Sequence, residues 1–366
     1  MREADRDGEA DRERVSRRAF LGGAAGLGAA SLAGCLGVLE TRRATREPPL
    51  PADRPDAPYL PTHTEGMGAA DVAANGRYRC LVSYTFPHRF WLVTGDDTER
   101  VNTEAGEDVH LMVSVWDAET GVALPAASPR AELTGPKGKS KSVTPWQMLS
   151  QQMGVHYGDN VALGPEGRWD VTVRVAPGAT RRANPVEPPE SPVAFETPFA
   201  FERSALEDLP YNDVPNDRQG TKGAVDPMQM PAVQAGVVPS ATDFPLEVRG
   251  TATTGSAELV VGTADQRGQY ATGGDESYLA ASLRTPHNRF ALPATSVAAE
   301  VTRGGETRWS GPLVAALDAD LGFHYAAAVP ALDDRDGVTV RVQTPPQVAR
   351  HEGYETAFFE FEPATL

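Results

Sequence analysis

The alternation of apolar and polar residues constrains the fold of this chain more than any other feature. Residues 109–115 read Val-His-Leu-Met-Val-Ser-Val, and residues 169–175 alternate in the same way. A period of two residues is typical of a β-strand with one face in a core. Turn-forming residues recur at short intervals, and no long stretch beyond the N-terminal region follows the period of an amphipathic helix. The sequence therefore predicts an all-β protein.

An internal repeat divides the chain into two related segments. The string Leu-Pro-Ala-Ala-Ser at 124–128 recurs as Leu-Pro-Ala-Thr-Ser at 292–296, and His156-Tyr157 recurs at the same spacing as His324-Tyr325. Several identities in one register indicate a duplicated module. Each module has roughly the size of an immunoglobulin domain and is rich in short strands. We therefore predict two immunoglobulin-like β-sandwiches in tandem, over residues 76–203 and 244–366.

Two stretches without apolar periodicity flank the first module. Residues 36–75 are rich in proline, arginine, aspartate and threonine, and residues 204–243 include Tyr-Asn-Asp-Val-Pro-Asn-Asp at 211–217. Such composition is typical of segments that bury too little apolar surface to fold alone. We interpret the first stretch as a flexible tether and the second as an interdomain linker.

The N-terminus has the pattern of an export signal. Arg17 and Arg18 precede a weakly apolar run from Gly22 to Gly34, which ends in Leu-Ala-Gly-Cys at Cys35. Paired arginines before such a run are typical of twin-arginine signals, and the closing residues resemble a lipobox. The run is too short and too rich in glycine to span a bilayer unaided. We predict that residues 1–35 are a twin-arginine signal and that lipid on Cys35 anchors the protein at the extracellular face of the cell membrane.

Charge and cysteine content narrow the classes of partner and site. The net charge is −16, and the chain contains only four lysines. This acidic, lysine-poor composition resembles that of secreted proteins from halophilic archaea, and it offers no basic face to nucleic acid. If Cys35 carries lipid, Cys80 has no disulfide partner. Cys80 is predicted to be a small buried residue, because it lacks the closely following histidine and methionine of a blue-copper site.

A candidate metal site begins on the alternating strand at 109–115. If the valines and the leucine face the core, His110 and Met112 stand on the opposite face, about 7 Å apart. Met148, Met153 and His156 lie ahead of the next alternating strand. Thioether plus imidazole is a ligand set suited to copper and acceptable to ferrous iron. The alternative is that these side chains fill an interface and shape a loop.

Two other histidines, His88 and His351, differ in how strongly the sequence supports them as ligands of this site. His88 lies in Pro-His-Arg-Phe-Trp after an apolar strand, and it is an additional candidate ligand because polar groups on loops beside aromatic residues often bind ligands. His351, followed by Glu352, is not included in the predicted site.

The second module keeps His324 but replaces its potential partners. Tyr278, Ala316 and Leu321 stand in the positions of His110, Met148 and Met153. A histidine that persists without those partners indicates that the His-Tyr pair also has a structural role. We therefore expect the second module to bind no metal.

Three strings together resemble the bacterial periplasmic iron-transport proteins that work beside high-affinity iron permeases. They are Asp-Val-His at 108–110, Gly-Val-His-Tyr-Gly-Asp-Asn-Val at 154–161, and the Gly-Arg-Trp strand from 167 that ends in Val-Ala-Pro at 175–177. The likeness covers about residues 76–200. The second module is linked to the family only because it repeats the first module. Two modules behind a twin-arginine lipobox also look like a haloarchaeal lipoprotein branch of that family. The relatives are small immunoglobulin-fold dimers that hold copper or iron through histidine and methionine.

The resemblance implies ligands, a cofactor and partners. His110 and His156 match ligand histidines of the family, whereas Met112 and Met153 stand where the family has acids, and Met148 is one residue from the family methionine. A further histidine expected after the proline that ends the strand is missing here. The cofactor is therefore an iron or copper ion, and the softer ligand set favours copper(I) over iron(III). The implied partners are an iron permease or other membrane transporter, and the two modules are expected to form an intrachain pseudo-dimer that covers the face of His110.

Together these features favour an extracytoplasmic, lipid-anchored metal-binding protein that takes part in iron or copper uptake. The predicted metal ligands are His110, His156, Met148, Met153, Met112 and His88. The alternative is a structural or interaction lipoprotein of two modules that binds no metal. The sequence contains no recognisable Ser-His-Asp set, pair of catalytic carboxylates or phosphate-binding loop, so an enzyme is not expected.

Overall fold

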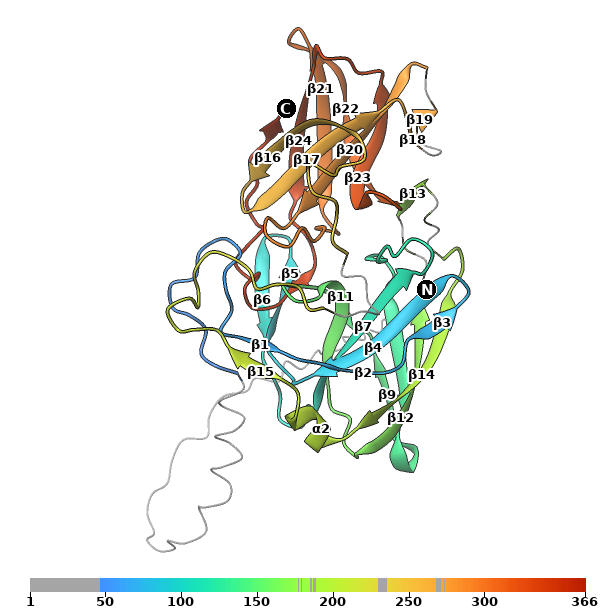
Figure 1. Ribbon diagram of the computed structural model, residues 1–366, viewed down its shortest axis with the longest axis vertical. Coiled ribbons are helices and arrows are strands. Elements are labelled where there is room, and N and C mark those ends of the chain that lie inside the picture. The colour runs from blue at the N-terminus through green and yellow to red at the C-terminus, as the bar shows by residue number, and fades with distance from the viewer. Residues whose placement is uncertain are drawn as a thin grey trace, which may run out of the picture. The chain divides into compact units, whose positions relative to one another are not determined.

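The computed structural model describes residues 47–366 except 177, 179, 185, 187–188, 230–235, 268–270 and 273. The predicted signal, with Arg17, Arg18 and Cys35, lies outside the described residues. Residues Glu47–Leu366 belong to one compact unit. This unit is mostly β, which confirms the fold class expected from the alternation (Figure 1). Its described helices are too short or too polar for a membrane crossing.

The first half of the unit is built from two sheets whose apolar faces share a core. The larger sheet contains, in spatial order, β2 (Gly68–Ala69), β4 (Tyr78–Thr85), β7 (Val109–Asp117), β11 (Gly154–Val161), β10 (Trp146–Ser150), β25 (Ala349–Arg350), β5 (Phe90–Thr94) and β6 (Asp97–Val101), with β3 (Ala73–Asn75) paired to β4. The smaller sheet contains β14 (Val193–Phe201), β12 (Gly167–Val175), β8 (Pro129–Thr134) and β9 (Ser140–Val143). The short helix η1 (Pro136–Gly138) lies between β8 and β9.

The second half is one sheet that continues through the long strand β22 (Glu306–Asp318). Residues 306–313 of β22 pair with β21, and residues 314–318 pair with β23. The spatial order is β16 (Glu247–Thr254), β17 (Ala257–Ala264), β20 (Glu276–Arg284), β23 (Gly322–Pro330), β22, β21 (Ser296–Arg303), β24 (Asp336–Thr344) and β26 (Ala364–Thr365). A two-stranded sheet of β18 (Gln266–Arg267) and β19 (Ala271–Thr272) adjoins it in sequence.

The two halves repeat one arrangement of strands. The order β4-β7-β11-β10 in the first half corresponds to β17-β20-β23-β22 in the second. The repeated His-Tyr pair lies on the equivalent strands β11 and β23. Both tyrosine hydroxyls bond to equivalent backbone, since the Tyr157 hydroxyl accepts the N–H of Ala127 at 2.7 Å and the Tyr325 hydroxyl accepts the N–H of Thr295 at 3.0 Å. The tyrosines therefore have the structural role that the repeat predicts.

Strand β7 lies in the middle of the larger sheet, between β4 and β11. Val109, Leu111, Val113 and Val115 belong to the core, which confirms the predicted alternation. The opposite face is also covered, because His110 is 0% exposed and Met112 is 2% exposed. Cys80 on β4 is a free, buried thiol, as expected, and burial raises its pKa to about 12.

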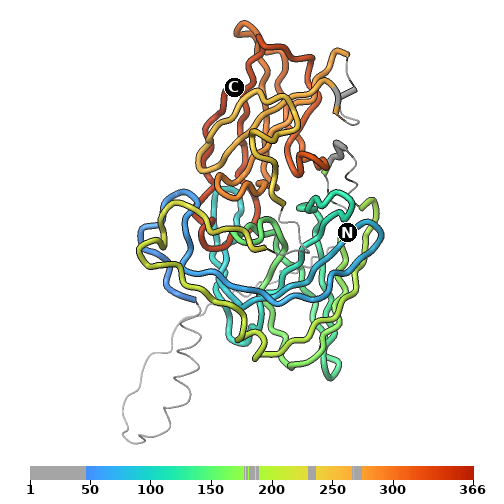
Figure 2. The backbone as a smooth tube through the Cα atoms, viewed as in Figure 1, coloured from blue at the N-terminus to red at the C-terminus, as the bar shows by residue number. Residues whose placement is uncertain are grey.

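Short strands connect segments that the sequence analysis kept apart. Strand β25 belongs to the second module in sequence, yet it pairs with β10 and β5 of the first (Figure 2). Conversely, β13 (Arg181–Asn184) pairs with β22. The segment interpreted as a tether contains β1 (His63–Glu65), and the segment interpreted as a linker contains most of α2 (Arg203–Glu207) and all of β15 (Tyr211–Asp213), which pairs with β1. The described parts of both segments therefore differ from the free chain expected there.

Candidate metal centre

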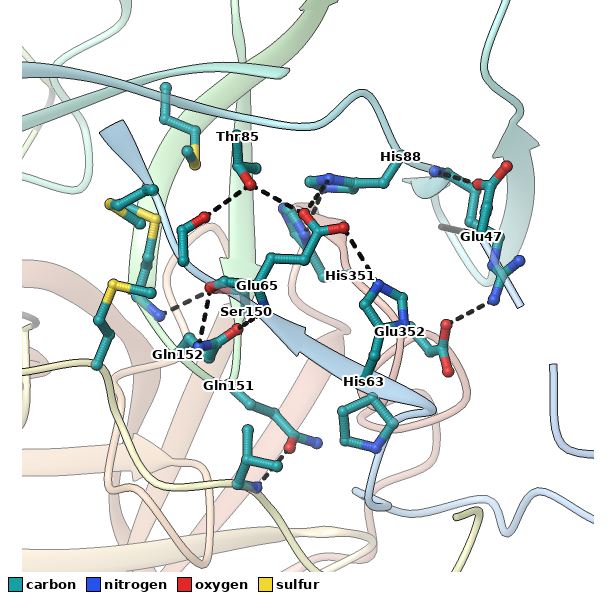
Figure 3. Close-up of a pocket in the computed structure, with 18 residues that line it drawn as sticks. Glu47, His63, Glu65, Thr85, His88, Ser150, Gln151, Gln152, His351 and Glu352 are labelled. Carbon is teal, nitrogen blue, oxygen red and sulfur yellow. Dashed lines mark hydrogen bonds and ion pairs between the residues drawn. The ribbon is translucent and has the colours of Figure 1, made fainter. Parts of the chain in front are cut away.

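Three histidines from distant parts of the chain meet on the covered face of the larger sheet. His88 follows β4, His110 lies on β7 and His351 directly follows β25, and one ligand nitrogen of each lies within 4.8 Å of the others. The ring centroids are 4.2 Å apart for His88 and His110, 4.8 Å for His88 and His351, and 5.5 Å for His110 and His351. We call these three residues the histidine cluster. Figure 3 shows two of them, His88 and His351, against each other at the edge of a pocket.

Asn160 on β11 positions two of these rings. Its Nδ2 donates to the His88 carbonyl oxygen at 2.9 Å, so its Oδ1 faces His110 and accepts a hydrogen bond from Nδ1 of that ring at 2.8 Å. A proton on Nδ1 leaves Nε2 of His110 with a free lone pair. This Nε2 is buried and has no hydrogen-bond partner. A ring oriented through one nitrogen, with the other unpartnered, is the usual arrangement of a metal-binding histidine.

Gly158 gives the His110 ring its space. A Cβ at this position would lie 2.5 Å from His110 Nε2 and 3.0 Å from Met148 Sδ, so only glycine is tolerated beside the ring. These two ligand atoms approach one small volume from neighbouring parts of the sheet. Met148 Sδ also lies 3.3 Å from His351 Nε2. The thioether of Met148 therefore adjoins the histidine cluster.

The loop that carries His351 is tied to three other segments. The His351 backbone N–H donates to Leu149 O at 3.1 Å, which continues the pairing of β25 with β10. The next residue, Glu352, accepts the backbone N–H of Thr62 at 2.7 Å and forms an ion pair of 2.7 Å with Arg89. These contacts join the loop to β10 and to the loop after β4. They therefore hold the His351 ring beside the rings of His88 and His110.

Burial keeps the histidines neutral. Desolvation lowers the pKa of His88, and desolvation together with neighbouring histidines lowers the pKa of His110 and His351 well below the usual value. Burial also lowers the pKa of His156 to about 4. Since the neutral imidazole is the form that binds metals, the cluster presents free lone pairs at neutral pH.

Neutral rings leave an electrostatic conflict around His351. His88 Nδ1 donates to Phe86 O at 3.0 Å, so His88 Nε2 carries a lone pair, and it lies 3.0 Å from His351 Nδ1. A neutral His351 has a single N–H, which satisfies either this contact or the one to Met148 Sδ. A metal ion bound by the opposed lone pairs removes the conflict. Bonds of about 2.0–2.1 Å to imidazole nitrogen join nitrogens roughly 3–4 Å apart.

The repeat supplies an internal comparison for His156. In the second half, His324 Nδ1 contacts Gly322 O at 3.0 Å and Nε2 contacts the Tyr278 hydroxyl at 2.6 Å, so both ring nitrogens have partners. In the first half, His156 Nδ1 makes the equivalent contact to Gly154 O at 3.1 Å, but Nε2 is buried without a hydrogen-bond partner. The difference falls on the nitrogen that would bind a metal.

The structure brings some of the sequence-predicted residues together and places others apart. His88, His110 and Met148 meet at the cluster, and the ring of His156 lies next to His351, 5.1 Å between centroids. Two further candidates, Met112 and Met153, instead line the pocket beside the cluster, which His88 and His351 also line.

His351 is the site residue that the sequence analysis missed. Its signal lies in the repeat and in the resemblance taken together. The family histidine expected after the proline that ends the strand is missing from the first module. In the second module, the equivalent strand β24 ends at Thr344 and is followed by Pro345, Pro346 and, shortly afterwards, His351. A histidine after the proline that follows this strand is thus present in the second module and absent from the first.

Comparisons with known proteins cover parts of the chain. A family model described as a domain of unknown function, DUF7350, matches residues 242–366. Among solved structures, FetP of uropathogenic Escherichia coli is similar, at 18% identity over 37% of this chain and 95% of that chain, with a TM-score of 0.30. A copper-bound variant of FetP is similar at 18% identity over 37% of this chain and 97% of that chain, with a TM-score of 0.29. No curated protein matches the chain.

Proposed function

We propose that this chain is an extracytoplasmic metal-binding protein that holds copper or iron at the histidine cluster and takes part in its uptake. The observation that carries the proposal is the convergence of three neutral imidazoles, His110 buried and His88 and His351 partly buried, whose ligand nitrogens lie within 4.8 Å of one another. Met148 and His156 supply adjoining ligand atoms. A set of imidazoles and thioether suits copper best and accepts ferrous iron.

The site also supports the proposed pseudo-dimer. His351 belongs to the second module, and it lies against His110, which belongs to the first. In the proposal, each module is immunoglobulin-like and the second completes a ligand set that the first offers only in part. The proposed uptake role has three further parts. They are a lipid anchor at Cys35, export directed by Arg17 and Arg18, and a membrane permease that accepts the metal. These additions are supported by the sequence pattern of residues 1–35 and by the family resemblance.

Metal binding by the full chain tests the proposal. After removal of metal with a chelator, titration with copper(II), ferrous iron or zinc should show one tight equivalent for at least one of these ions. His110→Ala and His156→Ala should each weaken it by more than the roughly 10–100-fold that loss of an outer supporting residue costs. Unchanged affinity in both variants would show that the metal, if any, binds elsewhere.

Asn160 should affect the same affinity without being a ligand. Asn160→Leu removes the acceptor that fixes the His110 tautomer, so we expect metal affinity to fall about 10–100-fold. Asn160→Asp keeps an acceptor for His110 Nδ1–H and should retain more of the affinity. Competition titrations measure both variants, with circular dichroism as the check of folding. Equal affinities for the leucine variant and the native chain would contradict a positioning role.

A further inference from the structure

The described methionines all gather at one place. The chain has seven methionines, and the structure describes five of them. Met148 adjoins the histidine cluster, and the other four, Met67, Met112, Met153 and Met228, line the neighbouring pocket of about 100 Å³. Eighteen residues line this pocket, and at the overall frequency of methionine in the chain fewer than one methionine is expected among them. The gathering therefore requires a reason beyond composition.

The four pocket methionines come from separate segments. Met67 precedes β2, Met112 lies on β7, Met153 lies between β10 and β11, and Met228 lies in the segment after β15. Two of them are held by backbone contacts, since Met153 N–H donates to Ser150 Oγ at 3.1 Å and Met228 N–H donates to Gln152 O at 2.8 Å. Figure 3 shows the sulfur atoms of the pocket on the side away from His63. The chain thus places four methionines from separate segments in the lining of one pocket.

Packing alone does not explain this arrangement. Methionine often fills irregular gaps in cores, and a filler leaves no open volume. Here an open pocket remains beside the methionines, and its volume exceeds that of a single water molecule. Met67 and Met228 are only partly buried, so the thioethers extend from the buried Met112 toward solvent.

The chemistry of the lining selects the class of ligand. Thioethers are neutral, soft ligands that favour copper(I) and its analogue silver(I) over harder ions. The same pocket is also lined by three acids, Glu47, Glu65 and Glu352, and by Arg89, and this balance of charge favours a cation over an anion. We propose that Met67, Met112, Met153 and Met228 form a second site, for a soft monovalent cation, beside the histidine cluster and distinct from it.

This thioether site goes beyond the proposed function, because it specifies an oxidation state and a place where the metal first binds. His88 and His351 belong to both the cluster and the pocket lining, so a cation held by the thioethers lies next to the cluster ligands. Copper(I) bound at the pocket would therefore reach the cluster without crossing bulk solvent. The transfer changes only the ligands and needs no electron donor or acceptor.

Silver(I) titration of the full chain tests the thioether site. The native chain should bind two equivalents, whereas a Met67→Leu/Met228→Leu variant should bind one. Leucine is close to methionine in volume and lacks only the sulfur, and both positions are partly exposed, so this variant should fold. His110→Ala serves as the matched variant, because His110 belongs to the cluster and does not line the pocket, and it should lose the cluster equivalent while it keeps the thioether equivalent. Native stoichiometry and affinity in the double leucine variant would overturn the inference.

X-ray absorption on the copper(I)-loaded chain gives a second readout that does not depend on a variant. At two equivalents per chain, occupation of both sites should give a first shell that averages more than one sulfur per copper. A shell with at most one sulfur per copper would overturn the inference and leave the proposed function intact. Conversely, if His110→Ala loses no silver while the leucine variant loses one equivalent, the thioether site stands and the function proposed for the histidine cluster fails.

Discussion

Replacing His351 with alanine should abolish stoichiometric binding of a divalent metal at the histidine cluster. His351 lies between the other ligands, since its Nδ1 is 3.0 Å from His88 Nε2, its Nε2 is 3.3 Å from Met148 Sδ, and its ring adjoins that of His156. Its removal takes away a central ligand and leaves the remaining lone pairs around an enlarged space. We expect affinity for copper(II) to fall by roughly 100-fold or more, beyond the loss caused by an outer supporting residue.

Two other histidines provide matched controls for this variant. His287 is exposed and lies outside the cluster, so His287→Ala should leave affinity unchanged. His324 has a partner at each ring nitrogen, so a substitution there should change stability and leave metal stoichiometry intact. Competition titrations at neutral pH measure all three variants. Native affinity in His351→Ala would remove the basis for a site shared by the two modules.

The strand that carries His110 was predictable because its pattern is local. In a strand, the period of two sets the face of each side chain whatever covers that face. Val109, Leu111, Val113 and Val115 therefore indicate the core, and His110 is placed opposite them. The repeat was predictable for a similar reason, since identities in one register predict equivalent strands.

The position of His351 was not predictable from local pattern. It lies 203 positions from Met148 and 263 from His88. The strand before it, β25, is two residues long, so it contains no periodicity to detect. Its place depends on pairing with β10 on one side and β5 on the other. A partner choice over such distances in the chain is a property of the assembled sheet.

Composition was an incomplete guide to the segments interpreted as tether and linker. Both contain few apolar residues in a regular pattern, yet they are held by polar contacts that composition does not record. Gln151 Nε2 donates to Tyr59 O at 2.7 Å, and Gln151 Oε1 accepts the N–H of Val225 at 2.8 Å. The buried carboxylate of Glu355 accepts hydrogen bonds from the Tyr59 hydroxyl and from Arg54. These partners lie far away in the chain, so the two segments are ordered by the fold rather than by their own sequence.

Metal binding should raise the free energy of unfolding by about 4 kcal/mol when free metal is about one thousand times the Kd. The native state holds ligands from the loop after β4, from β7 and from the loop after β25 in one cluster, and unfolding separates them. The chain without metal should remain folded, because its core does not depend on the cluster: Trp169 and Phe201 are 0% exposed and lie in the sheet pair of the first half. This distinguishes the chain from zinc fingers, which unfold when the metal is removed.

Urea unfolding with and without copper(II) measures this stabilisation. Trp91 is a suitable fluorescent probe, because it is 7% exposed and pairs with Arg350 directly beside His351. The unfolding midpoint of the native chain and of His287→Ala should rise on addition of metal, whereas that of His351→Ala should rise by less than half as much, because a 100-fold loss of affinity leaves about 1.4 kcal/mol of the stabilisation. Equal midpoints for the native chain in both conditions, at saturating metal, would mean that the unfolded chain binds the ion as well as the folded one does. The ligands would then not depend on the pairing of β25 with the first module, and the argument that the fold assembles the site would fail.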